Sequence, residues 1–90
     1  MQYQVKYSQD KNKDLKGKRG ISFEEVVKAI EAKQVIADLP NAQRPNQRIM
    51  IIKISGYIWV MPYVIDHERH HIFLKTVYQS RKYQKIYKGK

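Results

Sequence analysis

Two short apolar segments on either side of Ser55-Gly56 constrain the fold of this chain more than any other feature. Residues 49–54 and 57–61 are rich in β-branched and aromatic side chains, as strands are. A two-residue loop that contains glycine is typical of a tight β-hairpin turn. The sequence therefore predicts a hairpin over residues 48–65, in which Ile52 lies opposite Trp59.

The predicted pairing gives the hairpin two faces, because side chains alternate along each strand. One face is aliphatic and comprises Ile49, Ile51, Ile58, Val60 and Val64. The other face, which we call the aromatic face, comprises Arg48, Met50, Ile52, Tyr57, Trp59, Met61 and Tyr63. We expect a helix to cover the aliphatic face, and the aromatic face to border water because Tyr and Trp have polar tips.

The clearest helix signal precedes the hairpin. Ser22 is a predicted N-cap, and Glu25 three residues later completes a capping box. An apolar stripe at helical spacing follows, formed by Phe23, Val26, Val27 and Ile30. We expect this helix to end near Lys33-Gln34, and the Pro-containing residues 39–47 to form a surface loop.

The N-terminal residues add one strand and a basic segment. Residues 2–7 alternate polar and apolar side chains, which predicts a short first strand. Residues 8–19 are polar and rich in lysine, and form either a loop or a short helix anchored by Leu15. Gly20 is expected to end this segment.

The C-terminal residues change from strand to helix periodicity. Residues 72–78 predict a last strand, but its register on the hairpin stays open. Depending on the loop length, either Lys75 or the pair Thr76 and Tyr78 lies on the aromatic face. Ser80 is then a predicted N-cap for a short basic helix.

Together these elements predict one α+β domain over residues 1–90. We expect a small antiparallel sheet of about four strands, with helices on one face and the short basic helix at the C-terminus. The chain has no cysteine, no run of ~18 apolar residues, and no apolar segment at its N-terminus. We therefore expect a cytoplasmic protein without disulfides, thiolate metal sites or membrane spans.

The net charge of +10 lies entirely at the two ends of the chain. Residues 1–20 contain six cations and two anions, and residues 75–90 contain six cations and no anion. Residues 21–74 contain six of each sign, so the middle is balanced. This asymmetry favours a nucleic acid or an acidic protein as partner, although two solvated basic tails would give the same count.

The side chains available for chemistry are Arg, Lys, Tyr and His. Residues 66–71 contain His67, His70 and His71, but their spacing matches no zinc motif, so a polar turn is expected rather than a metal site. No glycine-rich phosphate loop or cofactor motif is present in the sequence. The remaining set suits RNA cleavage by the adjacent 2′-hydroxyl, because the substrate then supplies its own nucleophile.

Two stretches resemble a known family. Residues 18–26, Lys-Arg-Gly-Ile-Ser-Phe-Glu-Glu-Val, are similar to the K-H-G-V-x-F-E-E-A stretch of BrnT-type toxins of the RelE-like ribonuclease superfamily. Ser80-Arg81-Lys82 after the last strand, and the region of Asp10-Lys11-Asn12, resemble that family too, whereas Arg19 replaces its usual His. The resemblance implies a RelE-like fold and an endoribonuclease toxin that inhibits growth until an antitoxin binds it. It also implies an antitoxin of ribbon-helix-helix type, a toxin–antitoxin hetero-oligomer, and contact with operator DNA only through the antitoxin.

The charge pattern and the resemblance together suggest a metal-independent site. We expect Arg81 and Arg48 to hold the scissile phosphate, and Tyr78, Lys75 or His70 to transfer protons. The RNA backbone would contact further cations, Lys18, Arg19, Lys82 and Lys85. An antitoxin would dock on aromatic side chains, Tyr57, Trp59 and Tyr63. The alternative is a non-catalytic RNA- or ribosome-binding module with the same basic ends.

Overall fold

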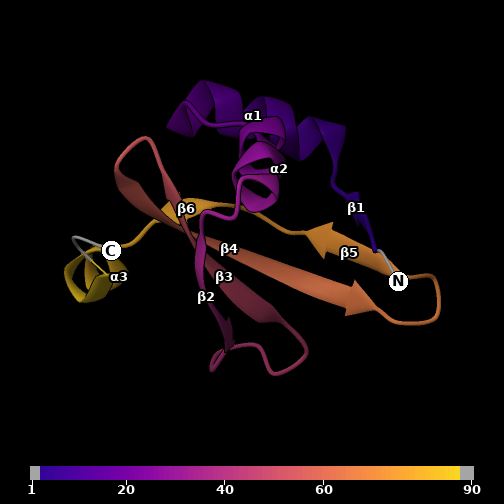
Figure 1. The fold of residues 1–90 in the computed structure, drawn as a ribbon. Coiled ribbons are helices and arrows are strands. Elements are labelled where there is room, and N and C mark those ends of the chain that lie inside the picture. The colour runs from indigo at the N-terminus through magenta and orange to yellow at the C-terminus, as the bar shows by residue number, and fades with distance from the viewer. Residues whose placement is uncertain (1–2, 88–90) are drawn as a thin grey trace.

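The computed structural model describes residues 3–87, and its helices pack on both faces of one mixed sheet (Figure 1). The elements in chain order are β1 (Gln4–Lys6), α1 (Gln9–Arg19), α2 (Phe23–Glu31), β2 (Val35–Pro40), β3 (Arg48–Ile54), β4 (Tyr57–Asp66), β5 (His71–Leu74), β6 (Tyr78–Gln79) and α3 (Arg81–Tyr87). The strand order is β1-β5-β4-β3-β2, and β6 pairs with the first half of β4. The α+β class is confirmed. The sheet has six strands rather than about four, and it is not purely antiparallel because β1 runs parallel to β5.

The central hairpin is confirmed with its predicted register. β3 and β4 pair from Ile54 opposite Tyr57 to Arg48 opposite Tyr63. Ser55 and Gly56 have φ angles of 52° and 83°, the left-handed values that a tight hairpin turn requires. The two faces of the hairpin therefore contain the residues that the sequence assigns to them.

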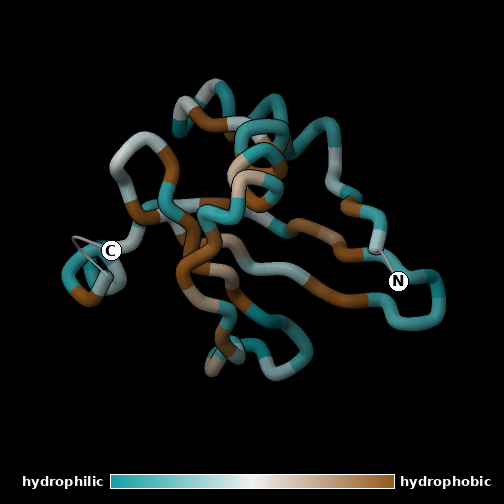
Figure 2. The backbone as a smooth tube through the Cα atoms, viewed as in Figure 1, coloured by the Kyte–Doolittle hydropathy of each residue, from teal (hydrophilic) through white to brown (hydrophobic). Residues whose placement is uncertain are grey.

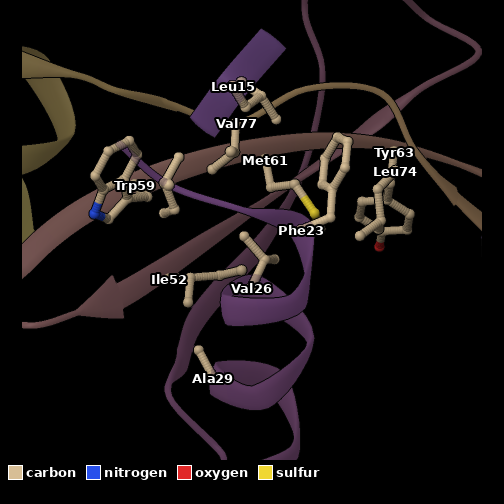
Figure 3. Close-up of a cluster of buried hydrophobic side chains, with 11 residues drawn as sticks. Leu15, Phe23, Val26, Ala29, Ile52, Trp59, Met61, Tyr63, Leu74 and Val77 are labelled. Carbon is tan, nitrogen blue, oxygen red and sulfur yellow. The ribbon is translucent and has the colours of Figure 1, made fainter. Parts of the chain in front are cut away.

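The helices cover these faces in the opposite way from the prediction. α2 packs Phe23 and Val26 against the aromatic face, beside Met61 and Ile52, and Trp59 lies in the same core cluster (Figure 3). Trp59 is 8% exposed and Tyr63 is 2% exposed, so the expectation that this face borders water is wrong. The main core cluster comprises Leu15, Ile21, Phe23, Val26, Ala29, Ile52, Trp59, Met61, Tyr63, Leu74 and Val77.

The aliphatic face has a cover of its own. Tyr83 and Tyr87 of α3 stack with ring centroids 6.2 Å apart and pack on this face, beside Ile36 and Leu39 of β2. Figure 2 shows that hydrophobic residues dominate the middle of the hairpin, whose buried positions lie on both faces. Because both faces are apolar, the alternation of side chains in the sequence cannot decide which of them α2 covers.

The basic N-terminal segment, which was expected to be either a loop or a short helix, is a helix. The Ser8 side chain caps the start of α1, and Gly20 ends it with a φ of 66°. Leu15 is buried and anchors α1 to the core, as expected. The capping box of α2 is also confirmed, since Glu25 N donates to Ser22 Oγ (3.2 Å) and Ser22 N donates to Glu25 Oε1 (3.3 Å).

A cluster of polar side chains ties α1 to α2. Asn12, which is 2% exposed, accepts a hydrogen bond from Phe23 N (2.7 Å). Its Nδ2 donates to Glu24 Oε1 (3.0 Å) and Oε2 (2.7 Å), and the Tyr7 hydroxyl donates to Glu24 Oε2 (2.8 Å). The bonds from Asn12 and then Tyr7 lower the pKa of Glu24 to about 2, and the Glu24 carboxylate raises the pKa of Tyr7. These hydrogen bonds fix the position of α1 relative to the first turn of α2.

β2 is a strand that was not predicted from the sequence. It pairs antiparallel with β3 at the edge of the sheet, from Val35 opposite Ile52 to Pro40 opposite Arg48. Pro40 is compatible with this position because an edge strand has one side without a partner strand. The surface loop predicted over residues 39–47 therefore begins only after Pro40.

The last strand is split in two. Residues 75–77 separate β5 from β6, and the pairing with β4 shifts by one residue between them. As a result Leu74 and Gln79 share the aromatic face, whereas Tyr78 lies on the opposite face. Each of the two predicted registers holds for one half of this strand. β5 follows the register that was expected to place Thr76 and Tyr78 on the aromatic face, and β6 follows the other register, which turns Tyr78 away from that face. Within residues 3–87, no helix has the length and apolar composition needed to cross a membrane.

Candidate nucleic-acid interface

An open pocket lies between the C-terminal end of α1 and the short strand β6. It has a volume of about 620 Å³ and is lined by Lys18, Arg19, Trp59, Tyr78 and Gln79. Lys18 and Arg19 come from the first basic segment, and Tyr78 and Gln79 come from the C-terminal segment. The fold thus joins two parts of the chain that are about sixty residues apart in the sequence.

Arg19 is held in place by the backbone of the segment between β5 and β6. Its Nη1 donates to the carbonyl oxygen of Val77 at 2.7 Å. Val77 and Leu15 are both buried in the main core, so α1 and this segment share packing as well as a hydrogen bond. One Nη1 bond leaves most of the guanidinium donors available, because arginine has five N–H groups. Lys18 forms an exposed ion pair with Asp14 (3.1 Å), which contributes little to stability.

A second pocket adjoins the first at the start of α3. It has a volume of about 390 Å³ and is lined by Tyr57, Gln79, Ser80, Arg81, Gln84 and Lys85. Gln79 lines both pockets, so they form one continuous surface, which we call the basic surface. This surface lies along the outer edge of β6.

Two hydrogen bonds orient α3 at the basic surface. Ser80 Oγ accepts from Tyr83 N (3.3 Å), which confirms the predicted N-cap. Gln84 Oε1 accepts from Ile58 N (2.9 Å), a backbone donor of β4 beyond the end of β6. Arg81 lies on the first turn of α3 and is exposed. Its side chain is therefore open to solvent on a helix that is fixed to the sheet.

The basic surface is cationic and partly aromatic. Its cations are Lys18, Arg19, Arg81 and Lys85, and within residues 3–87 no Asp, Glu or His lines either pocket. Two tyrosines offer exposed rings, Tyr57 at 58% and Tyr78 at 37%. Cations beside accessible aromatic rings are the combination that binds single-stranded nucleic acid, because the cations contact phosphates and the rings stack on bases.

Most of the residues proposed from the sequence meet at this surface. They are Lys18, Arg19, Tyr57, Trp59, Tyr78, Arg81 and Lys85. Lys82 is nearby on the first turn of α3, with its Nζ 5.3 Å from the centroid of the Tyr83 ring, but it does not line either pocket. Trp59 contributes one edge to the pocket while most of its side chain is in the core.

Arg48 lies elsewhere and has an acidic partner. Its Nε is 3.0 Å from Asp38 Oδ1, and the Tyr63 hydroxyl donates to Asp38 Oδ2 at 2.6 Å. Burial, followed by the bond to Asp38, raises the pKa of Tyr63 to about 12, and Asp38 also raises the pKa of Arg48. Arg48 lies opposite Tyr63, and Trp59, which pairs with Gln79 of β6, is four residues away along β4. At about 3.3 Å per residue, the backbone of Arg48 is therefore roughly 13 Å from the place where β6 pairs with β4. Arg48 and Arg81 therefore do not converge on one phosphate, and the buried Tyr63 is not available as an antitoxin anchor.

The two other proton-transfer candidates are also outside the basic surface. His70 lies in the β4–β5 turn with a φ of 56°, and its ring centroid is 5.3 Å from that of Tyr3. This turn is at the end of the sheet opposite α3 (Figure 1). Lys75 is exposed between β5 and β6 and lines a different pocket, together with Arg44. Of the three candidates, only Tyr78 lines the basic surface.

Two glutamines that shape this surface were not predicted from the sequence. Gln79 connects the two pockets, and Gln84 attaches α3 to β4. Neither has a sequence signal, because their roles depend on a strand break and on a backbone donor far along the chain. The surface can bind phosphate, stack bases and exchange protons at Tyr78 and at its lysines. In comparisons with known proteins, the chain matches no family model, no curated protein and no solved structure.

Proposed function

We propose that this protein is an endoribonuclease toxin of a toxin–antitoxin pair that binds single-stranded RNA at the basic surface. The observation that carries the proposal is the meeting of both basic ends of the chain at pockets without an acidic lining residue among residues 3–87. Pockets that are lined, among these residues, by four cations and no acidic residue favour a polyanion, which would compete with Asp14 for Lys18. Exposed tyrosines favour unpaired bases over a duplex. The resemblance of residues 18–26 and 80–82 to BrnT-type toxins supports RNA as the polyanion.

The proposed reaction is an internal transesterification of the RNA strand. The 2′-oxygen of one nucleotide loses its proton and attacks the adjacent phosphorus, and the bond from phosphorus to the 5′-oxygen breaks. The leaving 5′-oxygen takes up a proton, so the products are a 2′,3′-cyclic phosphate and a 5′-hydroxyl. The protein must therefore bind the phosphate, orient the strand and handle two protons.

The residues of the basic surface suit these tasks. Arg19 and Arg81 contribute guanidinium groups from two different elements to adjoining pockets, where they would neutralise the charge of the phosphorane. Tyr78 and Lys18 carry the exchangeable protons in the first pocket. Tyr57 and Tyr78 would stack the bases on either side of the cleaved bond. No metal ion or cofactor is required by this scheme.

The proposed partner in the cell is an antitoxin, and the proposed compartment is the cytoplasm. An antitoxin of ribbon-helix-helix type with an acidic segment would complement the cations of the basic surface and block RNA at the same place. Tyr57, which is 58% exposed at the rim of the second pocket, is the aromatic anchor available to it. The toxin–antitoxin hetero-oligomer would contact operator DNA through the antitoxin alone.

Inducible expression in a bacterial host tests the proposal. Expression of the wild-type protein should stop growth and fragment transcripts, whereas Arg81→Ala should restore both growth and intact RNA. Arg69→Ala is the matched control, because Arg69 is an exposed arginine in the β4–β5 turn at the opposite end of the sheet. Normal growth with intact transcripts at high wild-type levels would rule out the toxin.

A second candidate function is favoured by one feature of the same surface. No His or carboxylate lines the two pockets among residues 3–87, although these are common proton-transfer groups. The candidate is a non-catalytic module that binds RNA or the ribosome. It predicts salt-sensitive RNA binding that Arg81→Ala weakens, with no strand cleavage at any protein concentration.

A further inference from the structure

A third pocket extends the basic surface past β6. It has a volume of about 520 Å³, and its lining includes the three cations Lys11, Arg44 and Lys75. These cations come from α1, from the β2–β3 loop and from the segment between β5 and β6. As in the other two pockets, no Asp or Glu lines it within the described residues 3–87.

The third pocket is continuous with the basic surface through Tyr78. Tyr78 lines both this pocket and the pocket of Lys18 and Arg19. Gln79, the next residue, lines that pocket and the pocket of Arg81. The two residues of β6 therefore connect three adjoining pockets around the edge of the sheet. We call these three pockets together the track.

The β2–β3 loop presents side-chain amides at the far end of the track. Asn41, Gln43 and Gln47 line the third pocket with Arg44. The loop is held by its own hydrogen bonds, since Arg44 N donates to Asn41 O (3.2 Å) and Gln47 N donates to Arg44 O (2.9 Å). The side-chain amides of Gln43 and Gln47 make no hydrogen bond within residues 3–87, so their donors and acceptors are available to base edges.

We propose that the third pocket is a second RNA subsite, which binds the nucleotides flanking those held at the basic surface. The inference rests on the proposed function and adds that the ligand is an extended single strand that passes over Tyr78. Lys11, Arg44 and Lys75 contact its phosphates, and the loop amides contact its bases. Lys75, which is outside the basic surface, thus has a role in substrate binding and not in proton transfer.

The test measures the binding of RNA that cannot be cleaved by its own 2′-oxygen. Fluorescently labelled 2′-O-methyl RNAs of about 4 and about 12 nucleotides cover the range of site sizes of single-strand-binding domains. The variant Arg44→Gln/Lys75→Gln removes two exposed cations of the third pocket, and Lys13→Gln/Lys28→Gln removes two exposed cations outside the three pockets. Circular dichroism confirms that each variant is folded.

The wild-type protein should bind the longer RNA more tightly than the shorter one. The Arg44→Gln/Lys75→Gln variant should lose this gain, with about two- to tenfold weaker binding of the long RNA per cation removed. Its plot of log affinity against log salt should become shallower by about 0.7 per cation, whereas the control variant and the short RNA should be nearly unaffected.

The outcomes separate the inference from the proposed function. Retention of the length-dependent gain in the Arg44→Gln/Lys75→Gln variant, or an equal loss for both RNA lengths, would overturn the second subsite alone. Wild-type protein that binds the short RNA but gains nothing with length would do the same. Failure of the wild-type protein to bind either RNA would overturn the subsite together with RNA binding at the basic surface.

Discussion

Replacement of Asn12 by Ala tests how the fold positions the basic end of α1. The Asn12 side chain is the buried link between α1 and the first turn of α2. It accepts from Phe23 N at 2.7 Å and donates twice to the Glu24 carboxylate. Alanine removes all three hydrogen bonds, while the Tyr7 hydroxyl and Lys16 still contact Glu24.

The expected loss of stability follows from what each partner retains. Phe23 is fully buried, so its N–H would stay without a partner, and an unpaired buried donor costs about 1–3 kcal/mol. Glu24 is partly exposed, and water can replace the donors that it loses. For a domain of this size, 1 kcal/mol lowers the melting temperature by about 4–8 °C. We therefore expect Asn12→Ala to melt at least about 4 °C below the wild-type protein.

Urea denaturation followed by circular dichroism measures this effect directly. Asn46→Ala in the exposed β2–β3 loop is the matched control, and it should change the free energy of unfolding by less than about 0.5 kcal/mol. Asn12→Asp keeps an acceptor for Phe23 N but places a second carboxylate against Glu24, so its stability should rise as the pH falls toward the pKa of that pair. If Asn12→Ala and Asn46→Ala unfold at the same urea concentration, the assigned role of Asn12 is wrong.

Three further predictions follow from the side-chain contacts. The pKa of Glu24 is lowered from 4.5 to about 2 in the folded protein. The Glu24 carboxylate therefore stabilises the fold fully above about pH 4.5, and this stabilisation is lost as the pH falls toward 2. The urea midpoint of Glu24→Gln should lack this part of the pH dependence. Tyr63→Phe removes the 2.6 Å bond to Asp38 and should cost about 1–2 kcal/mol by urea denaturation, while ultraviolet titration should lose a tyrosine transition near pH 12. Gln84→Ala removes the acceptor of Ile58 N, so hydrogen exchange at the Ile58 amide should accelerate about tenfold, and unchanged exchange would show that this bond does not hold α3 to the sheet.

The features of the fold that depend on neighbouring residues are predicted correctly from the sequence. Ser22 and Glu25 form the expected capping box, and Ser55-Gly56 sets the hairpin register at every pair from Ile54–Tyr57 to Arg48–Tyr63. These signals depend on side chains or backbone angles a few residues apart. Local sequence is sufficient to determine them.

The features that depend on distant contacts are not predicted. The parallel pairing of β1 with β5 joins residues that are almost seventy positions apart, and no local pattern encodes it. β2 ends in Pro40, whose loop propensity led to the prediction of a loop from residue 39 onward. The assignment of α2 to the wrong face arises because Tyr83 and Tyr87 also need an apolar partner, and they occupy the aliphatic face.

The candidate site shows the same division. The charge count favours one polyanionic partner for both ends of the chain. The structure places Lys18 and Arg19 in a pocket with the two β6 residues, and Arg81 in the adjoining pocket. Arg48 and His70 lie elsewhere. This could not be predicted, because the sequence shows no distances between residues of different strands. The ion pair of Arg48 with Asp38 forms between β3 and β2, and β2 was not predicted from the sequence.

Cleavage of a single-stranded RNA by the purified protein is the decisive measurement for the proposed nuclease activity. The assay compares an all-ribose RNA with a strand of the same sequence that carries 2′-deoxyribose throughout. Both are incubated in EDTA, with and without ribosomes. Attack by the 2′-oxygen should give products with a 2′,3′-cyclic phosphate and a 5′-hydroxyl from the all-ribose RNA only, at a rate that Arg81→Ala lowers by about 100-fold or more. Equal cleavage of the deoxyribose strand would contradict attack by the 2′-oxygen, and tight binding without any cleavage would identify the protein as a non-catalytic RNA-binding module.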